Sequence, residues 1–154
     1  MPFLSSMDIS GSALTASRLR MDVISENISN AETTRTVKGG PYRRKLVVYE
    51  PQTQQGDSSF QSMLDNEMSA SSSDPSNQFG GVKVSAIVDD PTPFTQVYDP
   101  SSPDANAQGY VQKPNVDIVK ETLDMMSVSR AYSANLNAFN AVKTMASKAL
   151  EMGK

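Results

Sequence analysis

The sequence of 154 residues contains no cysteine, no histidine and no tryptophan. Without cysteine and histidine the chain lacks disulfides, thiol nucleophiles, imidazole bases and the usual ligand sets of zinc and haem. We therefore expect no catalytic residues, no metal site and no cofactor. The protein is not expected to be an enzyme.

Apolar residues and net charge are also scarce. The apolar share is 38%, against roughly 45–50% in ordinary globular chains, so a single compact core is not expected. The net charge is −3, and the longest basic run is Arg43-Arg44-Lys45. Because a polyanion is bound by a basic face, nucleic acid and anionic membranes are not expected as partners.

Long apolar segments are missing as well. No window approaches the roughly 18 apolar residues that a membrane-spanning helix needs. The N-terminus, "MPFLSSMDIS", lacks the basic and apolar regions of a signal peptide. We expect neither a membrane span nor a cleaved signal, so that export from the cytoplasm would require a signal-independent route.

The sequence does contain two segments with helical periodicity, and the first covers residues 5–30. Ser5 and Asp8 suit its first turn, because a hydroxyl caps a free amide and a carboxylate complements the helix dipole. Ile24 lies between apolar positions that recur every seven residues, namely Met7, Leu14, Met21 and Ile28. The following Asn, Ser and Thr residues are poor helix formers and predict the end of this helix.

The second helical segment runs from after Pro114 to about Met152, with Asn115 or Asp117 as its cap. One row of positions seven residues apart contains Ile118, Met125, Tyr132, Phe139 and Ala146. A second row contains Glu121, Val128, Asn135, Val142 and Ala149, so that two polar residues interrupt an apolar seam. A third row of Ala131, Ala138, Met145 and Met152 widens the stripe. This width predicts that the helix contacts more than one neighbour.

The segment between the helices has the composition of short strands and polar loops. Strands are predicted at residues 42–50 and 81–90, and a third at 94–99, because β-branched and aromatic residues gather there. They would form a small antiparallel sheet or hairpin. Residues 52–80 are rich in Ser, Gln and Asp and predict a flexible loop.

The predicted fold class is therefore mainly α with a small β middle. Residues 5–34 and 114–154 would form a helical core in which long terminal helices make a coiled-coil layer. Residues 35–113 would form the middle region of short antiparallel strands and flexible loops.

Several local features have a functional and a plain interpretation. Asp89-Asp90, which precedes a proline, is interpreted as a solvated turn and not as a metal or acid–base pair. Arg43-Arg44-Lys45 is interpreted as a solvated strand face and not as an anion site. The glycine pairs at 39–40 and 80–81 lack the lysine and spacing of a phosphate loop and are interpreted as turns.

A helical hairpin within one chain is the plain explanation of the two seams. The unequal lengths of the two helices and the absence of a third helix argue against it as a complete explanation. Two helices and one small sheet would leave much of both broad apolar stripes exposed to water.

The terminal segments are similar to a known protein family. "SGSALTASRLRMDVISENISNAETT" (10–34) resembles the N-terminal motif of the bacterial flagellar rod and hook axial proteins, and residues 109–154 resemble their C-terminal motif. "GGPYRRKLVVYEP" (39–51) and "VYDPSSPDANAQGYV" (97–111) are closer to the proximal rod members than to the distal ones.

The resemblance implies a structural subunit of the flagellar basal-body rod. Such a subunit is exported without a cleaved signal by the flagellar type III apparatus and polymerises into the helical drive shaft that crosses the periplasm and transmits torque. Its partners would be copies of itself, other rod proteins, the hook–basal body adaptor proteins, the MS-ring proteins and the export apparatus.

In this family the terminal helices form an inner coiled-coil layer. The residues expected to pack subunits are Leu14, Met21, Ile24, Asn27, Ile28, Asn30, Ile118, Met125, Val128, Tyr132, Asn135, Phe139 and Val142. Tyr132 and Asn135 belong to the "SRAYSAN" element and are expected to pack and hydrogen-bond, since an Asn inside a seam fixes register. The alternative function is a monomeric helical binding module, such as an export adaptor that holds a partner chain on its stripes.

Overall fold

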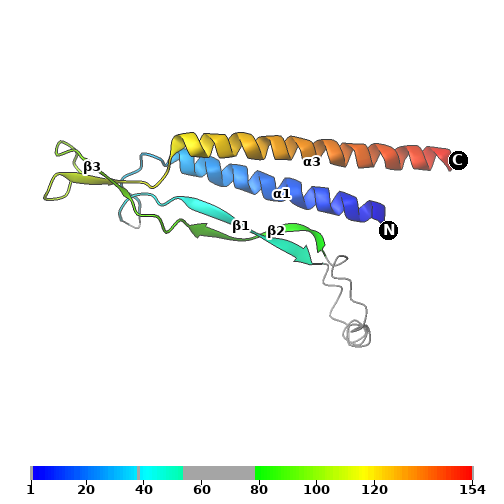
Figure 1. Cartoon of the computed structure of the whole chain (residues 1–154), viewed down its shortest axis with the longest axis horizontal. Helices are drawn as coiled ribbons and strands as arrows, with labels where there is room; N and C mark the ends of the chain where they lie inside the picture. Colours follow the sequence, from blue (N-terminus) through cyan, green and yellow to red (C-terminus); the bar gives the residue numbers. More distant parts are fainter. Residues whose placement is uncertain (1, 38, 54–78, 154) are drawn as a thin grey trace, which may run out of the picture.

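A computed structural model describes residues 2–37, 39–53 and 79–153 of the chain. It contains two long helices and four strands (Figure 1). In chain order the elements are α1 (Pro2–Ser29), β1 (Lys45–Thr53), β2 (Phe79–Asp89), β3 (Thr95–Tyr98), β4 (Tyr110–Lys113) and α3 (Ile118–Met152). The predicted fold class, mainly helical with a small β middle, is confirmed.

The two helices lie side by side and run in opposite directions (Figure 1). Helix α3 has 35 residues and α1 has 28, so the C-terminal turns of α3 extend past the start of α1. Of the two predicted caps, Asp117 is the one used: its carboxylate accepts hydrogen bonds from the backbone N–H of Val119 and of Lys120, at 3.0 and 3.4 Å. These bonds satisfy amides that have no partner inside the helix.

The β middle consists of two separate antiparallel ribbons. Strands β1 and β2 pair from Lys45 opposite Asp89 to Thr53 opposite Phe79, with a bulge after Val48. This ribbon lies along α1, on the side away from α3 (Figure 1). The second ribbon pairs β3 with β4 and lies beyond the ends of both helices. Strand β4 was not predicted.

The ribbon approaches α1 most closely at Gly81, where the prediction of a turn at 80–81 was wrong. Both glycines lie within β2. Gly81 has a φ of +124°, and a Cβ at this position would lie 2.2 Å from Oγ of Ser12. The Ser12 hydroxyl accepts a hydrogen bond from the N–H of Val82 at 3.2 Å and donates to the carbonyl of Ile9 at 2.8 Å. Glycine is therefore required by both the backbone conformation and the helix contact.

The flexible loop predicted for 52–80 lies almost entirely outside the described residues. At its ends, β1 reaches Thr53 and β2 begins at Phe79. Within the described part of the chain, no helix is long and apolar enough to cross a membrane. The hydrophobic residues that are buried there are few: Ala16, Val23, Ile24, Ala31, Tyr42, Val111 and Val128.

Candidate functional site

The helix seam brings most of the predicted packing residues into partly or fully buried positions. Ile24, Asn27 and Val128 are buried. The half-buried ones are Leu14, Met21, Ile28, Asn30, Met125, Tyr132, Asn135, Phe139 and Val142. Ile118 is 48% exposed at the first position of α3. The side chain of Asn135 makes no hydrogen bond to any described residue, in contrast to that of Asn27.

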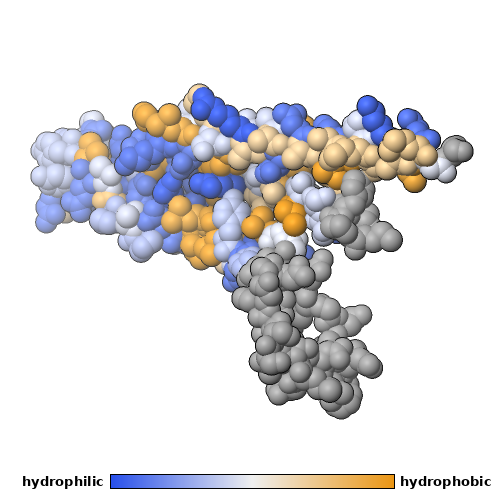
Figure 2. Space-filling view, turned by 45° about the vertical axis from the view of Figure 1, so that its right-hand side comes forward, coloured by the Kyte–Doolittle hydropathy of each residue, from blue (hydrophilic) through white to orange (hydrophobic). Residues whose placement is uncertain are grey.

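Pairing with α1 covers only one side of α3. Val119, Leu123 and Met126 follow one another along an uncovered side, and Leu123 is 61% exposed. Met145, Leu150 and Met152 are exposed near the C-terminal end. Figure 2 shows the alanine-rich and apolar surface that runs along α3 toward this end. A helical hairpin forms within the chain, but it leaves these apolar residues without cover.

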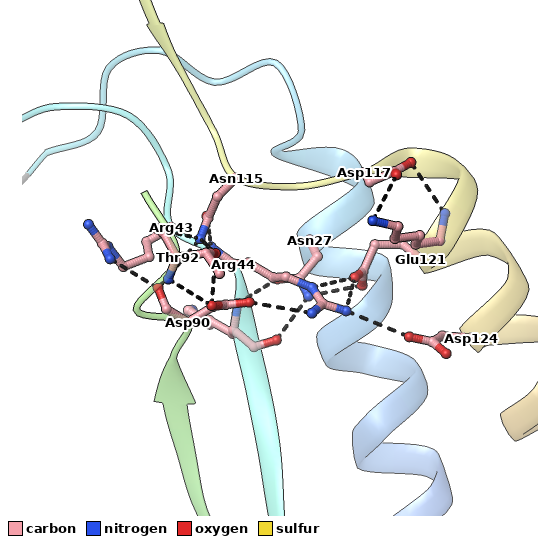
Figure 3. A network of polar contacts seen from close by, with 11 residues as sticks. Asn27, Arg43, Arg44, Asp90, Thr92, Asn115, Asp117, Glu121 and Asp124 are labelled. Atoms are coloured by element: carbon pink, nitrogen blue, oxygen red, sulfur yellow. Dashed lines mark hydrogen bonds and ion pairs between the residues drawn. The ribbon is translucent and has the colours of Figure 1, made fainter. Parts of the chain in front are cut away.

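A buried group of polar side chains connects the helices to the ribbon (Figure 3). We call it the joint cluster, and it consists of Asn27, Tyr42, Arg44, Lys45, Asp90, Asn115 and Glu121. Its members come from α1, the segment before β1, the start of β1, the end of β2, the segment before α3, and α3 itself. Within the described residues, every buried side-chain nitrogen and oxygen has a hydrogen-bond partner.

Asn27 is the centre of the joint cluster and is 1% exposed. Its Oδ1 accepts from the Tyr42 hydroxyl at 3.0 Å and from the Lys45 N–H at 2.9 Å. Its Nδ2 donates to the Lys45 carbonyl at 3.0 Å and to Oε2 of Glu121 at 3.0 Å. An amide side chain has two donor and two main acceptor positions, and all four are used here.

Arg44 and Glu121 form the ion pair of the joint cluster. Glu121 is 1% exposed, and its Oε1 accepts a hydrogen bond from Nε of Arg44 at 2.6 Å. A terminal nitrogen of Arg44 forms an ion pair with the same oxygen, also at 2.6 Å. Arg44 also lies 3.4 Å from Asp90 and 3.6 Å from Asp124. Burial opposes the charge of Arg44, but the hydrogen bond and charge of Glu121 outweigh it and raise the pKa of the guanidinium.

The predicted solvated strand face at Arg43-Arg44-Lys45 is therefore wrong. Arg43 stacks over the ring of Phe94, 4.5 Å from its centroid, and donates to the carbonyl of Asp90 at 3.0 Å. Lys45 forms a short ion pair with Glu26 of α1. The three cations have partners in other segments that their local sequence could not identify.

The prediction of a solvated turn was also wrong for Asp90, which is buried. Its Oδ1 accepts from the N–H and the hydroxyl of Thr92 at 2.9 and 2.8 Å. These bonds, and then the nearby Arg44, lower the pKa of Asp90 although burial opposes them. The ionised carboxylate thus stabilises the fold above its ordinary pKa, and this contribution is lost as the pH falls through the lowered value. Asn115 donates to the hydroxyl of Thr92 at 2.8 Å and accepts from the N–H of Arg44 at 2.8 Å.

Tyr42 provides a titration signal for the joint cluster. Burial, followed by the charges of Glu26, Asp89 and Glu121, raises the pKa of its hydroxyl to about 12. Because the folded state favours the neutral phenol, the stabilisation is complete below the ordinary pKa near 10 and is lost as the pH rises through about 12. The chain has five tyrosines, so comparison with Tyr42→Phe by ultraviolet titration isolates this group. We expect the variant to lose the component that ionises near pH 12; an unchanged titration curve would contradict this assignment.

Sequence reasoning missed Glu121, which was interpreted as an interruption of an apolar row. The sequence did contain a signal for a buried polar pair. Glu121 lies in a row of α3 that faces the neighbouring helix, and Asn27 has a similar position on α1. A charged residue at a seam position of a helix is almost never fully buried unless it is paired. The partner, Arg44, lies 77 residues away in sequence, and no local pattern connects the two.

Comparison with known proteins decides the family. Residues 7–35 match the family described as flagella basal body rod protein. Residues 107–152 match the family described as flagellar basal body rod FlgEFG protein C-terminal. The flagellar basal-body rod protein FlgC of Bacillus subtilis is 52% identical over 153 residues, which cover 97% of each chain. The chain belongs to the FlgC family.

Two further FlgC proteins have lower identity over similar lengths. Those of Borreliella burgdorferi and Salmonella typhimurium are 40% and 37% identical, and the matches cover 97% and 100% of both chains. The two family matches coincide with α1 and with β4 and α3, so Asn27 and Glu121 both lie inside them. The prediction of a structural flagellar rod protein is confirmed. Among the described residues, no group of acidic side chains is arranged to hold a metal ion.

Proposed function

We propose that this FlgC chain polymerises into a helical drive shaft that crosses the periplasm and transmits torque. The observation that carries the proposal is the uncovered apolar side of α3, where Val119, Leu123 and Met126 are exposed although the opposite side packs on α1. Exposed apolar patches flanked by polar residues mark protein–protein contacts. An assembly protein requires such a surface, and pairing of the two helices in one chain does not use it.

In this proposal each copy contacts the next through two different surfaces. A surface that packs on a different surface of the next copy produces a helical polymer, whereas a surface that packs on itself produces a closed dimer. In this proposal residues 5–34 and 114–154 form the assembly domain, and the predicted packing residues lie in it. Residues 35–113 form the middle region beside this domain. Ile118, which α1 leaves exposed, would be covered by a neighbour.

The proposed partners are copies of this chain, other rod proteins, the hook–basal body adaptor proteins, the MS-ring proteins and the type III export apparatus. Export is proposed to proceed without a cleaved signal, as the resemblance to the flagellar axial proteins implies. Nucleic acid is not part of the proposal, since the chain has a net charge of −3 and no long basic run. Direct membrane insertion is not part of it either, since no sequence window approaches the roughly 18 apolar residues of a membrane span.

Leu123→Asp tests the proposal at the uncovered side of α3. Leu123 is exposed in the single chain, so the change is expected to shift its free energy of unfolding by no more than about 0.5 kcal/mol. In the polymer the aspartate would be buried without a partner, which is costly. We expect cells that carry only this variant to lose motility and the protein to be absent from purified basal bodies.

Leu123→Met is the matched control, because it keeps an apolar side chain with similar helix propensity; it should assemble and support motility. Normal motility with Leu123→Asp would contradict assembly through this surface. If the wild-type protein itself were missing from purified basal bodies, the alternative function of a monomeric binding module or export adaptor would be favoured.

A further inference from the structure

The side chain of Asn27 binds the start of the ribbon as a neighbouring strand would. It accepts from the N–H of Lys45 and donates to the carbonyl of the same residue. Adjacent strands exchange the same pair of bonds. Helix α1 thus holds the ribbon by its backbone, and the contact depends on the geometry of one amide group and not on the side chain of Lys45.

The Asn27 amide can take only one orientation in this position. Turning it over would place its NH₂ group against the Lys45 N–H and its oxygen against the Glu121 carboxylate. Both contacts would be repulsive, and the buried groups would lose their partners. Glu121 is in turn fixed by a hydrogen bond and an ion pair from Arg44. Because Arg44 directly precedes β1 and Glu121 belongs to α3, the orientation of the amide connects three segments (Figure 3).

Polar contacts between described residues attach α1 to the β1–β2 ribbon in at least two separate places. One is the joint cluster at the start of β1, and another is the bond from the Val82 N–H to Ser12 at 3.2 Å. Ser12 lies near the middle of α1 and Asn27 near its C-terminal end. A ribbon held at two points keeps its direction, whereas a ribbon held only at Ser12 could turn about that contact.

We propose that Asn27 and Glu121 act as positioning residues that fix the angle between the ribbon and the helix pair in the assembled rod. A load on the helices is then passed to the β1–β2 ribbon, and the ribbon does not rotate relative to the helices at the joint cluster. The inference rests on the proposed function for its role in the rod, but the fixed angle is a property of the single chain and can be measured there.

The test reverses the donor and the acceptor of the Asn27–Glu121 bond without changing the total charge. Asn27→Asp alone removes both donated bonds and places a second carboxylate about 3 Å from Glu121. In the double variant Asn27→Asp/Glu121→Gln, the new amide of residue 121 donates to the new carboxylate of residue 27. The bond is restored in the opposite direction, and one negative charge remains at the pair.

The angle is monitored through the distance between two spin labels attached to the purified full-length chain. The protein has no cysteine, so Ser127→Cys on α3 and Ser85→Cys on β2, both at exposed positions, introduce the only two labelling sites. We expect one narrow distance distribution in the labelled parent chain and a broad or shifted one with Asn27→Asp. The same single change is expected to lower the yield of assembled rods by about tenfold or more. The double variant restores the bond to residue 121 but not the bond to the Lys45 carbonyl, so the distribution should become narrower than in Asn27→Asp and part of the yield should return.

Three outcomes would overturn the inference. The first is a parent-like narrow distribution in Asn27→Asp, whatever its assembly yield. The second is a double variant that folds, by its circular dichroism, yet keeps the broad distribution. The third is a double variant that is as unfolded as the single one. None of these depends on Leu123→Asp, so failure of the positioning role and failure of the proposed assembly surface give different results.

Discussion

Replacement of Val128 by aspartate is expected to separate α1 from α3 and to abolish rod formation. Val128 is 6% exposed in the seam between the two helices. An aspartate there would bury a charge with no partner, at a cost of about 4 kcal/mol or more. The described core contains few buried hydrophobic residues, so the loss is a large share of the 5–15 kcal/mol that stabilises a typical domain. Urea unfolding of the purified chain and motility of cells with only this variant measure the two effects.

Ser127→Asp is the matched control for this experiment. It adds the same charge one residue earlier, on the exposed side of the same helix. Its effect on the free energy of unfolding is expected to stay within about 0.5 kcal/mol. An unfolding midpoint for Val128→Asp close to that of Ser127→Asp would show that the seam does not hold the two helices together.

The helices and most of their ends could be predicted because the information is local, but the start of α1 was wrong: the helix begins at Pro2 and not at Ser5. Rows of apolar residues seven positions apart require a helix that packs along one side, and the Asp117 cap is recognisable from the residues next to it. The three strands β1, β2 and β3 were found within a few residues of their limits for the same reason. The third row was expected to contact a neighbour, and its members Ala131 and Met145 are exposed, but the exposed residues Val119, Leu123 and Met126 lie on another side of α3 and were not predicted.

The joint cluster could not be predicted because it depends on segments distant in sequence. Arg44, Asp90 and Glu121 had plain local interpretations as a strand face, a turn and an interrupted row. Asn27 was expected to pack subunits. Only the fold brings them within hydrogen-bond distance. The same holds for Gly81, whose requirement arises from Ser12 on the other side of the contact.

Replacement of Arg44 by alanine is expected to have the second large effect, because it leaves the carboxylate of Glu121 buried without its cation. Removing one partner of a buried ion pair costs about 3–5 kcal/mol. Asp90 would lose the same partner, while the bonds that Asn27 and Thr92 donate would remain. We expect a lower unfolding midpoint in urea and a corresponding loss of rods from purified basal bodies.

Two further variants assign this loss to the buried charge. Arg43→Ala removes the neighbouring cation, which stacks on Phe94, and should cost only about 0.5–1 kcal/mol. Arg44→Ala/Glu121→Gln removes the uncompensated charge and keeps an acceptor for Asn27, so it should recover part of the stability that Arg44→Ala loses. If Arg44→Ala were no more harmful than Arg43→Ala, the ion pair would contribute little. If the added Glu121→Gln change gave no recovery, the loss would come from missing packing and not from the charge of Glu121.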